Sequence, residues 1–181
     1  KITKSIYFKN FKFKKLNNKI FKSFKNLIEN DSQLIHSLNT NYKNSYAKKI
    51  IFKFKRYSEI KLIGMGGSIL GARSIYSFLK YKIKKNFTFI DTLNFSNNKK
   101  NNKKKCLNLI ISKSGNTLET ITNVNILIKD NQKKIFITQN TKSYLMKLAT
   151  KLKADIVHHN NFIGGRYSVL SEVGMLPAEL M

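Results

Sequence analysis

The stretch LNLIISKSGNTLET (residues 107–120) is an apolar run that passes directly into a loop rich in hydroxyl groups. The run predicts a buried strand over 107–112, and the amphipathic sequence after it predicts a helix over about 117–129. In an open parallel sheet, ligands bind beyond the carboxyl ends of the strands, where loops feed into helix N-termini. The stretch therefore predicts both a strand–loop–helix unit and a candidate binding loop.

The same alternation of strand and helix continues on both sides of this stretch. We expect further strands over 60–64, 87–90, 135–138 and 154–158, and helices over about 69–82 and 141–152. Five short strands alternating with helices predict an α/β fold, a three-layer α/β/α sandwich with a five-stranded parallel sheet. Residues 97–105, which are all asparagine and lysine, predict a polar surface loop.

The chain divides into three parts by pattern. Residues 1–55 form an N-terminal helical segment in this interpretation, with apolar spacing such as Leu34, Ile35 and Leu38 and a helix start at Asp31-Ser32. Residues 56–160 form the sheet domain, and 161–181 begin an inter-domain or active-site segment whose helix starts near Ser168. Because the chain begins at a lysine and stops at Met181 without a closing cap, we expect a part of a longer protein.

The formal charge of +26, from 35 lysines and arginines against 9 acidic residues, raises the question of nucleic acid. The lysines are scattered over the whole chain, and arginine occurs only at Arg56, Arg73 and Arg166. A dedicated nucleic-acid reader concentrates its basic residues on one face with aromatic platforms between them. We therefore expect no specific nucleic-acid partner, although the charge attracts anionic substrates.

Membrane, disulfide and metal chemistry are not indicated. No apolar run reaches the roughly 18–20 residues that span a bilayer, and lysines interrupt the N-terminal apolar residues, so we expect neither a transmembrane helix nor a signal peptide. The single cysteine, Cys106, excludes an internal disulfide and favours a reducing, cytoplasmic location. No His, Cys, Asp and Glu cluster has metal-ligand spacing, and we expect no metal or cofactor.

Two loops carry phosphate-handling chemistry. In residues 112–117 the hydroxyls of Ser112, Ser114 and Thr117, together with the backbone N–H groups of the following helix, can converge on phosphate oxygens. The alternative is a simple helix cap by Ser114 or Thr117, which explains one hydroxyl but not three. The second loop, residues 64–68, has glycines that let the backbone approach an anion, and Ser68 adds a hydroxyl.

These residues resemble a known domain. Gly66-Gly67-Ser68 after a strand, together with residues 112–120, is similar to the sugar isomerase (SIS) domain, a flavodoxin-like sandwich that binds phosphosugars. Residues 164–168, Gly-Gly-Arg-Tyr-Ser, resemble the signature of the glucose-6-phosphate isomerase family. The resemblance covers about residue 60 to the end and implies a homodimeric enzyme of glycolysis and gluconeogenesis that acts on a small sugar phosphate.

The resemblance also implies roles for individual residues. Arg166 would be catalytic, stabilising the negative charge of an enediol(ate) intermediate, and Glu119 would support the phosphate loop by hydrogen bonding. The substrate-binding group implied by the family is Gly67, Ser68, Ser112, Lys113, Ser114, Gly115, Asn116 and Thr117. The glutamate base, the ring-opening histidine and a catalytic lysine of the family would lie in later segments, and we expect His158 and His159 to be exposed loop residues.

Three hypotheses about the function remain open. The first is an aldose–ketose isomerase that interconverts glucose 6-phosphate and fructose 6-phosphate through a cis-enediol. The second is a dual phosphoglucose/phosphomannose isomerase, because the loop reads Ser-Gly-Asn-Thr over 114–117. Ile69 stands where the family usually has an acidic residue, a departure in the other loop. The third is a non-enzymatic SIS module that senses a phosphosugar, with the basic N-terminal segment binding DNA.

Overall fold

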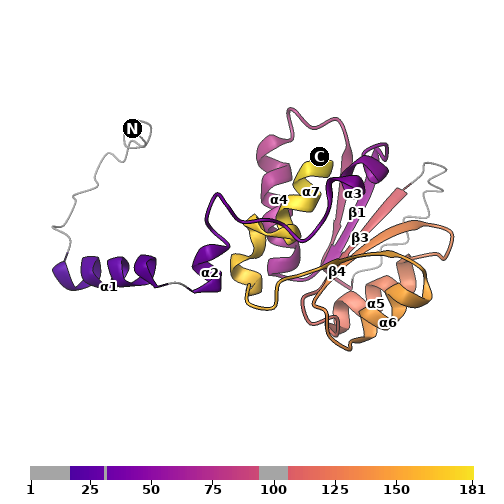
Figure 1. Ribbon diagram of the computed structural model, residues 1–181. Helices are drawn as coiled ribbons and strands as arrows, with labels where there is room; N and C mark the ends of the chain where they lie inside the picture. Colours follow the sequence, from indigo (N-terminus) through magenta and orange to yellow (C-terminus); the bar gives the residue numbers. More distant parts are fainter. Residues whose placement is uncertain (1–16, 31, 94–105) are drawn as a thin grey trace.

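Five parallel strands form one sheet in the order β2-β1-β3-β4-β5. They are β1 (Glu59–Gly64), β2 (Asn86–Ile90), β3 (Cys106–Ile111), β4 (Lys133–Thr138) and β5 (Asp155–His158). The computed structural model describes residues 17–30, 32–93 and 106–181, so the predicted 97–105 loop and Asp31 lie outside the described residues. The expected α/β sandwich with a five-stranded parallel sheet is confirmed, and Figure 1 shows helices on both of its faces.

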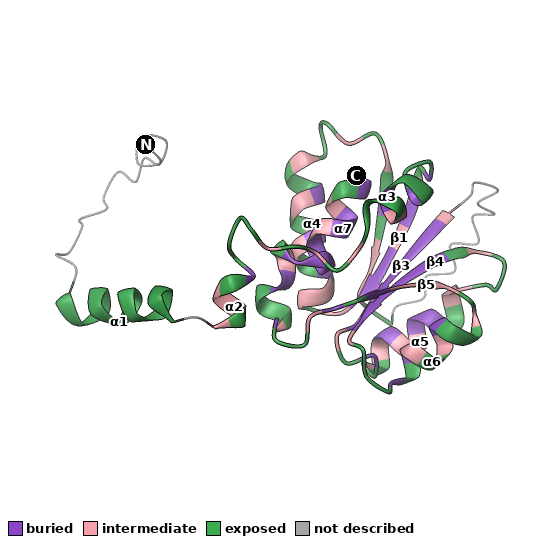
Figure 2. Ribbon diagram, viewed as in Figure 1, coloured by how far each residue is buried: buried purple, intermediate pink, exposed green. Residues whose placement is uncertain are grey.

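Alternating residues along each strand build two apolar layers, because successive side chains of a strand point to opposite faces. On one face the strands meet α3 (Lys48–Phe54), α4 (Gly67–Leu79) and α7 (Glu172–Leu180) in a shared core. On the other face Ile63, Ile110 and Phe136 pack against α5 (Leu118–Leu127) and α6 (Tyr144–Lys151). Figure 2 shows the buried strands between these two helical layers, whose exposed residues face outward.

Three of the helices begin within two or three residues of where the sequence predicts. α4 begins two residues early, because Gly66 has φ +56° and turns the chain into the helix directly after β1. α6 begins three residues late, because the Ser143 side chain accepts a hydrogen bond from the Met146 N–H and so sets the first turn. α5 begins at Leu118, within one residue of its predicted start.

The N-terminal helices contribute unequally to the core. α1 (Asn18–Glu29) and α2 (Gln33–His36) contain no buried residue, whereas Ile51 and Phe54 of α3 belong to the core under the sheet. In Figure 1, α1 stands away from the sheet. After β5 the chain forms the 3₁₀ helix η2 (Gly165–Leu170) and then α7, which begins at Ser171 as N-cap.

Candidate active site

The carboxyl ends of β1 and β3 lie side by side, and the two predicted loops emerge there together. Gly64, the last residue of β1, is the register partner of Ile111, the last residue of β3. A Cβ added to Gly64 would lie 3.0 Å from the Ile111 carbonyl oxygen, so the strand ends are in close contact. The sheet continues from β1 to β2 on one side and to β3 on the other, which makes this the switch point where parallel sheets bind ligands.

The phosphate loop, residues 112–117, is folded by its own hydroxyls. The buried Ser112 Oγ accepts a hydrogen bond from the Gly115 N–H at 3.2 Å and lies 3.0 Å from Thr117 Oγ1. The exposed Ser114 accepts the Asn116 N–H at 3.2 Å. Gly115 has φ +65°, a conformation that favours glycine. The loop is therefore shaped by hydrogen bonds among its own residues.

The first residues of α6, the helix that follows β4, hold the same loop by hydrogen bonds. The Leu145 N–H donates to the Gly115 carbonyl at 3.0 Å, and the Tyr144 N–H donates to Asn116 Oδ1 at 2.9 Å. A Cβ on Gly115 would lie 2.2 Å from Ser143 Oγ, so only glycine fits here. Asn116 thus holds α6 in this structure, a role that the sequence did not indicate.

The helix after the phosphate loop begins without a capping side chain. Thr117 occupies the N-cap position of α5, as expected, but its side chain makes no cap hydrogen bond and contacts Ser112 instead. α4, which begins in the other motif loop, also has no side-chain cap at Gly66, whereas Ser143 and Ser171 cap α6 and α7. Uncapped N–H groups and the helix dipole make such an N-terminus suitable for an anion.

Residues 164–168, which carry Arg166, lie directly against residues 66–68. A Cβ on Gly67 would lie 2.1 Å from the Gly165 carbonyl oxygen, so these two backbones meet without room for a side chain. Ser168, buried beneath them, donates from Oγ to the carbonyl oxygens of Gly165 at 2.8 Å and Gly67 at 3.4 Å. The structure therefore brings residues 164–168, 66–68 and 112–117 to one edge of the sheet.

Arg166 is exposed in η2, and within the described part of the chain it has no ion-pair partner. The guanidinium is always charged and presents fixed donors, so an exposed one next to the contact of Gly165 with Gly67 is available to a ligand.

The remaining predicted residues occupy the rims of the loops. Lys113 and Ser68 are half-buried, and the Lys113 carbonyl accepts the Gln139 N–H at 3.0 Å. Glu119 lies in the first turn of α5, where a negative charge interacts favourably with the helix dipole. The described residues show no hydrogen bond from its carboxylate to the phosphate loop, so its supporting role stays a prediction.

The sequence of this chain matches the model of the phosphoglucose isomerase family over residues 22–181. The chain belongs to this family. It is 32% identical over 173 residues to the glucose-6-phosphate isomerase of Borreliella afzelii, covering 86% of this chain and 31% of that protein. It is 38% identical over 132 residues to the glucose-6-phosphate isomerase of Methanocaldococcus jannaschii, covering 67% of this chain and 32% of that protein. The chain thus spans about a third of the length of these relatives.

Solved structures with low sequence identity share the fold. A hypothetical protein from Thermus thermophilus aligns with 90% of this chain and 46% of its own at a TM-score of 0.64 and 19% identity. The sugar isomerase domain of an RpiR transcription factor from Sphaerobacter thermophilus aligns with 91% of this chain and 90% of its own at a TM-score of 0.53 and 17% identity. The SIS architecture expected from the motifs is confirmed.

The structure corrects one expectation for this family member. His159 is buried rather than exposed, while His158 is exposed as expected. His159 Nδ1 lies 2.6 Å from Glu172 Oε1, and the side chains are 1% and 0% exposed. Alternation along β5 explains the burial, because Val157 points inward, His158 outward and His159 inward again. The alternation of side chains was the signal in the sequence for this burial, but polar residues at the end of a strand are also typical of a loop.

Glu172 is ionised in this environment. Burial by itself raises the pKa of the Glu172 carboxyl, but the hydrogen bonds from His159 and the Asn160 N–H outweigh it and leave the pKa below its ordinary value. Tyr42 Oη donates to Glu172 Oε2 at 3.1 Å. Burial and the adjacent Glu172 charge raise the pKa of Tyr42 to about 12, so the phenol keeps its proton.

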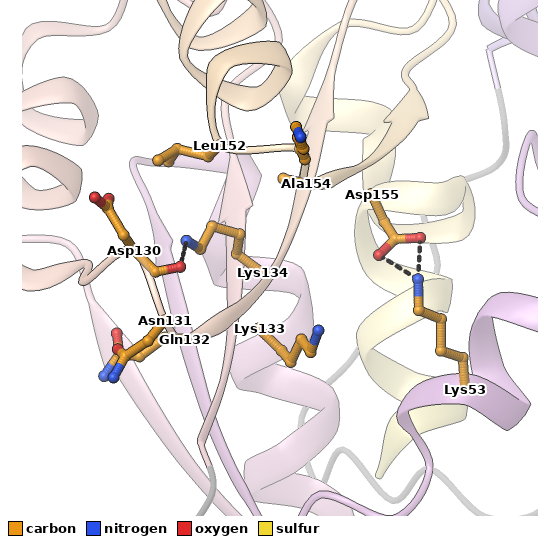
Figure 3. A pocket seen from close by; sticks show the side chains of 10 residues that line it. Lys53, Asp130, Asn131, Gln132, Lys133, Lys134, Leu152, Ala154 and Asp155 are labelled. Atoms are coloured by element: carbon orange, nitrogen blue, oxygen red, sulfur yellow. Dashed lines mark hydrogen bonds and ion pairs between the residues drawn. The ribbon is translucent and has the colours of Figure 1, made fainter.

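A separate polar pocket lies at the opposite edge of the sheet, at the amino ends of β4 and β5 (Figure 3). It has a volume of about 260 Å³. Several of its charged groups are engaged: Lys53 Nζ lies 2.8 Å from both Asp155 oxygens, and Lys134 donates to the carbonyls of Lys129 and Asp130. None of the three motifs reaches this pocket.

Two absences hold for residues 17–30, 32–93 and 106–181, the part of the chain that the structure describes. Among them no three His, Cys, Asp or Glu side chains are grouped so that they could hold a metal ion. None of the helices in this part of the chain is long and apolar enough to cross a membrane.

Proposed function

We propose that this chain is the phosphosugar-binding part of a glucose-6-phosphate isomerase, which interconverts glucose 6-phosphate and fructose 6-phosphate through a cis-enediol. The observation that carries the proposal is the meeting of three motifs at one sheet edge: the phosphate loop, Gly67-Ser68 and the loop of Arg166. The family membership and the names of the relatives support it.

The phosphate group is the part of the substrate that this chain is best built to hold. Its oxygens would accept hydrogen bonds from the hydroxyls of Ser114 and Thr117 and from the uncapped N–H groups of α5. Ser112 would act from behind, since its buried hydroxyl already shapes the loop. Lys113, half-buried beside the loop, adds positive charge. Anchoring the phosphate orients the distant C1 and C2 carbons for reaction.

Arg166 would act at the other end of the sugar. Moving a proton between C1 and C2 places negative charge on the enediol oxygens, and a fixed guanidinium stabilises that charge more in the transition state than in the substrate. The proton itself needs a base, which we place in the segments that the longer relatives have beyond the part matched here. Two subunits would share the site in a cytoplasmic homodimer.

The test is an isomerase assay of the native-length protein on glucose 6-phosphate and on fructose 6-phosphate. We expect turnover in both directions, and exchange of the C2 proton with solvent as the mark of an enediol. A pure, folded protein that converts neither sugar phosphate would refute the proposal.

The Ser-Gly-Asn-Thr loop favours one close alternative, a dual phosphoglucose/phosphomannose isomerase. Comparing turnover of mannose 6-phosphate with that of glucose 6-phosphate separates the two enzymes. The basic N-terminal segment is the feature that favours a phosphosugar-sensing module. DNA mobility shifts at physiological salt test it, and salt-resistant, sequence-specific binding would favour it over the enzyme.

A further inference from the structure

The loop that carries Arg166, residues 160–171, leaves the end of β5 and returns at the start of α7. We call it the arginine loop. Its two flanking residues, His159 and Glu172, touch each other across its base at 2.6 Å, and both side chains are almost completely buried. The loop is therefore closed by a charged pair rather than by an apolar contact.

The pair also holds the first half of the loop. His159 Nε2 faces the Ile163 carbonyl at 3.1 Å, and Glu172 Oε1 accepts the Asn160 N–H at 2.9 Å. Both ring nitrogens face oxygen atoms, so the ring is held on both sides. Each partner thus bonds its opposite number and one backbone group of the arginine loop.

Packing of α7 does not require this pair. Val173, Leu176 and Leu180 already bury α7 in the core with α4 and the sheet. Burying a carboxylate is costly, and a buried polar pair is weak support for stability compared with apolar residues of similar size. What the pair adds is a defined geometry for a polar loop, in which Ile163 is the fully buried apolar residue.

We propose that His159 and Glu172 are positioning residues that fix the arginine loop so that Arg166 faces the sugar held by the phosphate loop, an inference that rests on the proposed function. Tyr42 extends the arrangement to the N-terminal segment by donating to Glu172 Oε2. The Ser45 hydroxyl bonds the His158 carbonyl at 2.5 Å, which places the same segment against the other end of the loop.

The experiment compares substitutions in the native-length enzyme by steady-state kinetics. Glu172→Gln removes the charge but keeps the shape, and we expect kcat to fall about 10- to 100-fold with KM changed less than threefold, since misplacing a catalytic group affects the transition state. Tyr42→Phe, which deletes one hydrogen bond from an uncharged phenol to the Glu172 carboxylate, lowers kcat about fivefold. Tyr46→Phe is the matched control: it deletes the tyrosine bond to the exposed Glu179 and leaves kcat unchanged.

A second measurement needs no activity. Amide hydrogen exchange of the 181-residue chain should become faster in residues 160–171 of Glu172→Gln by a larger factor than at the Gly115 amide of the phosphate loop, which reports only the loss of global stability. Equal acceleration in both loops would show a general loss of stability and would overturn the inference. Tyr42→Phe provides the same comparison if Glu172→Gln does not fold.

The outcomes separate the two proposals. A wild-type enzyme without isomerase activity refutes the proposed function, and hydrogen exchange then decides by itself whether the pair fixes the loop. An active wild type whose Glu172→Gln and Tyr42→Phe variants keep kcat within twofold, or change only KM, overturns the positioning role and leaves the proposed function standing.

Discussion

The phosphate loop and the arginine loop lie at the same edge of the sheet but are held in different ways. The phosphate loop is shaped by contacts within six residues and by the start of α6, which follows the next strand. The arginine loop is held by Gly67, almost a hundred residues earlier, and through Glu172 by Tyr42, which is 130 residues from it. Binding groups that are fixed locally can be read from a sequence, whereas the support of Arg166 exists only in the folded chain.

Substitution of the buried pair of His159 and Glu172 is expected to have the largest effect on the support of the arginine loop. Glu172→Gln removes a buried carboxylate that is hydrogen-bonded to His159 and accepts the Asn160 N–H, and we expect a loss of about 3 kcal/mol in the free energy of unfolding at pH 7. Because the folded-state pKa of Glu172 lies below its ordinary value of 4.5, its contribution is present above that pH and is lost as pH falls through the folded-state pKa. Urea unfolding of the 181-residue chain across pH 3–7 measures this.

The wild type and the variant should therefore converge in stability at acid pH. Asp155→Asn, which breaks the partly exposed pair with Lys53, is the control and should cost less than about 1 kcal/mol at pH 7. A gap between wild type and Glu172→Gln that is the same at every pH would contradict ionisation of Glu172.

Arg166→Gln tests the proposed catalytic role of the arginine loop. Losing a donor to developing charge should lower kcat roughly 10²- to 10³-fold in the native-length enzyme, while stability changes little because the side chain is exposed. Arg56→Gln, which removes an exposed arginine stacked on Tyr57, should leave kcat unchanged. An equal effect of both substitutions on kcat would point to loss of bulk charge rather than of a specific group.

Substitution of two glycines tests the close contact between residues 66–68 and 164–168. Gly67→Ala places a Cβ 2.1 Å from the Gly165 carbonyl and should cost about 1–3 kcal/mol of unfolding free energy. In Gly165→Ala the new Cβ meets Gly67 Cα at 3.8 Å, an ordinary contact, and stability should change by less than about 0.5 kcal/mol. Thermal unfolding of both variants gives the comparison, and equal losses would contradict the one-sided close approach.

The smallest effect is expected at the rim of the phosphate loop. Ser114→Ala removes an exposed hydroxyl and should raise KM for glucose 6-phosphate about fivefold with kcat unchanged. Ser77→Ala, an exposed serine of α4, should change neither constant. A fall in kcat without a change in KM for Ser114→Ala would assign this residue to the reacting carbons instead of the phosphate.

Much of the fold could be predicted from the sequence, because apolar periodicity and loop composition are local properties. The strands begin within two residues of their expected starts, and the sheet is parallel as the alternation with helices indicated. The loops of the site were found because glycine and hydroxyl residues follow β1 and β3 directly.

Other features could not be found from local patterns. The place of Asn116 as a bond acceptor for α6 and the burial of His159 depend on neighbours brought by the fold. Nothing near Glu172 in the sequence indicates Tyr42 or His159 as its partners. The sequence also could not decide whether the Thr117 hydroxyl caps α5; in the fold it contacts Ser112 and makes no cap hydrogen bond, and its binding role stays a prediction.

The central claim, that the phosphosugar site lies at the β1–β3 edge, is tested most directly by NMR titration of the ¹⁵N-labelled 181-residue chain with glucose 6-phosphate at physiological salt, with glucose and inorganic phosphate as controls. We expect saturable shifts of the amides of residues 112–119 and 66–68, with glucose 6-phosphate binding more tightly than inorganic phosphate. Shifts that instead centre on the pocket of Lys133 and Lys153, or that spread over all lysine-rich surfaces without saturating, would contradict it.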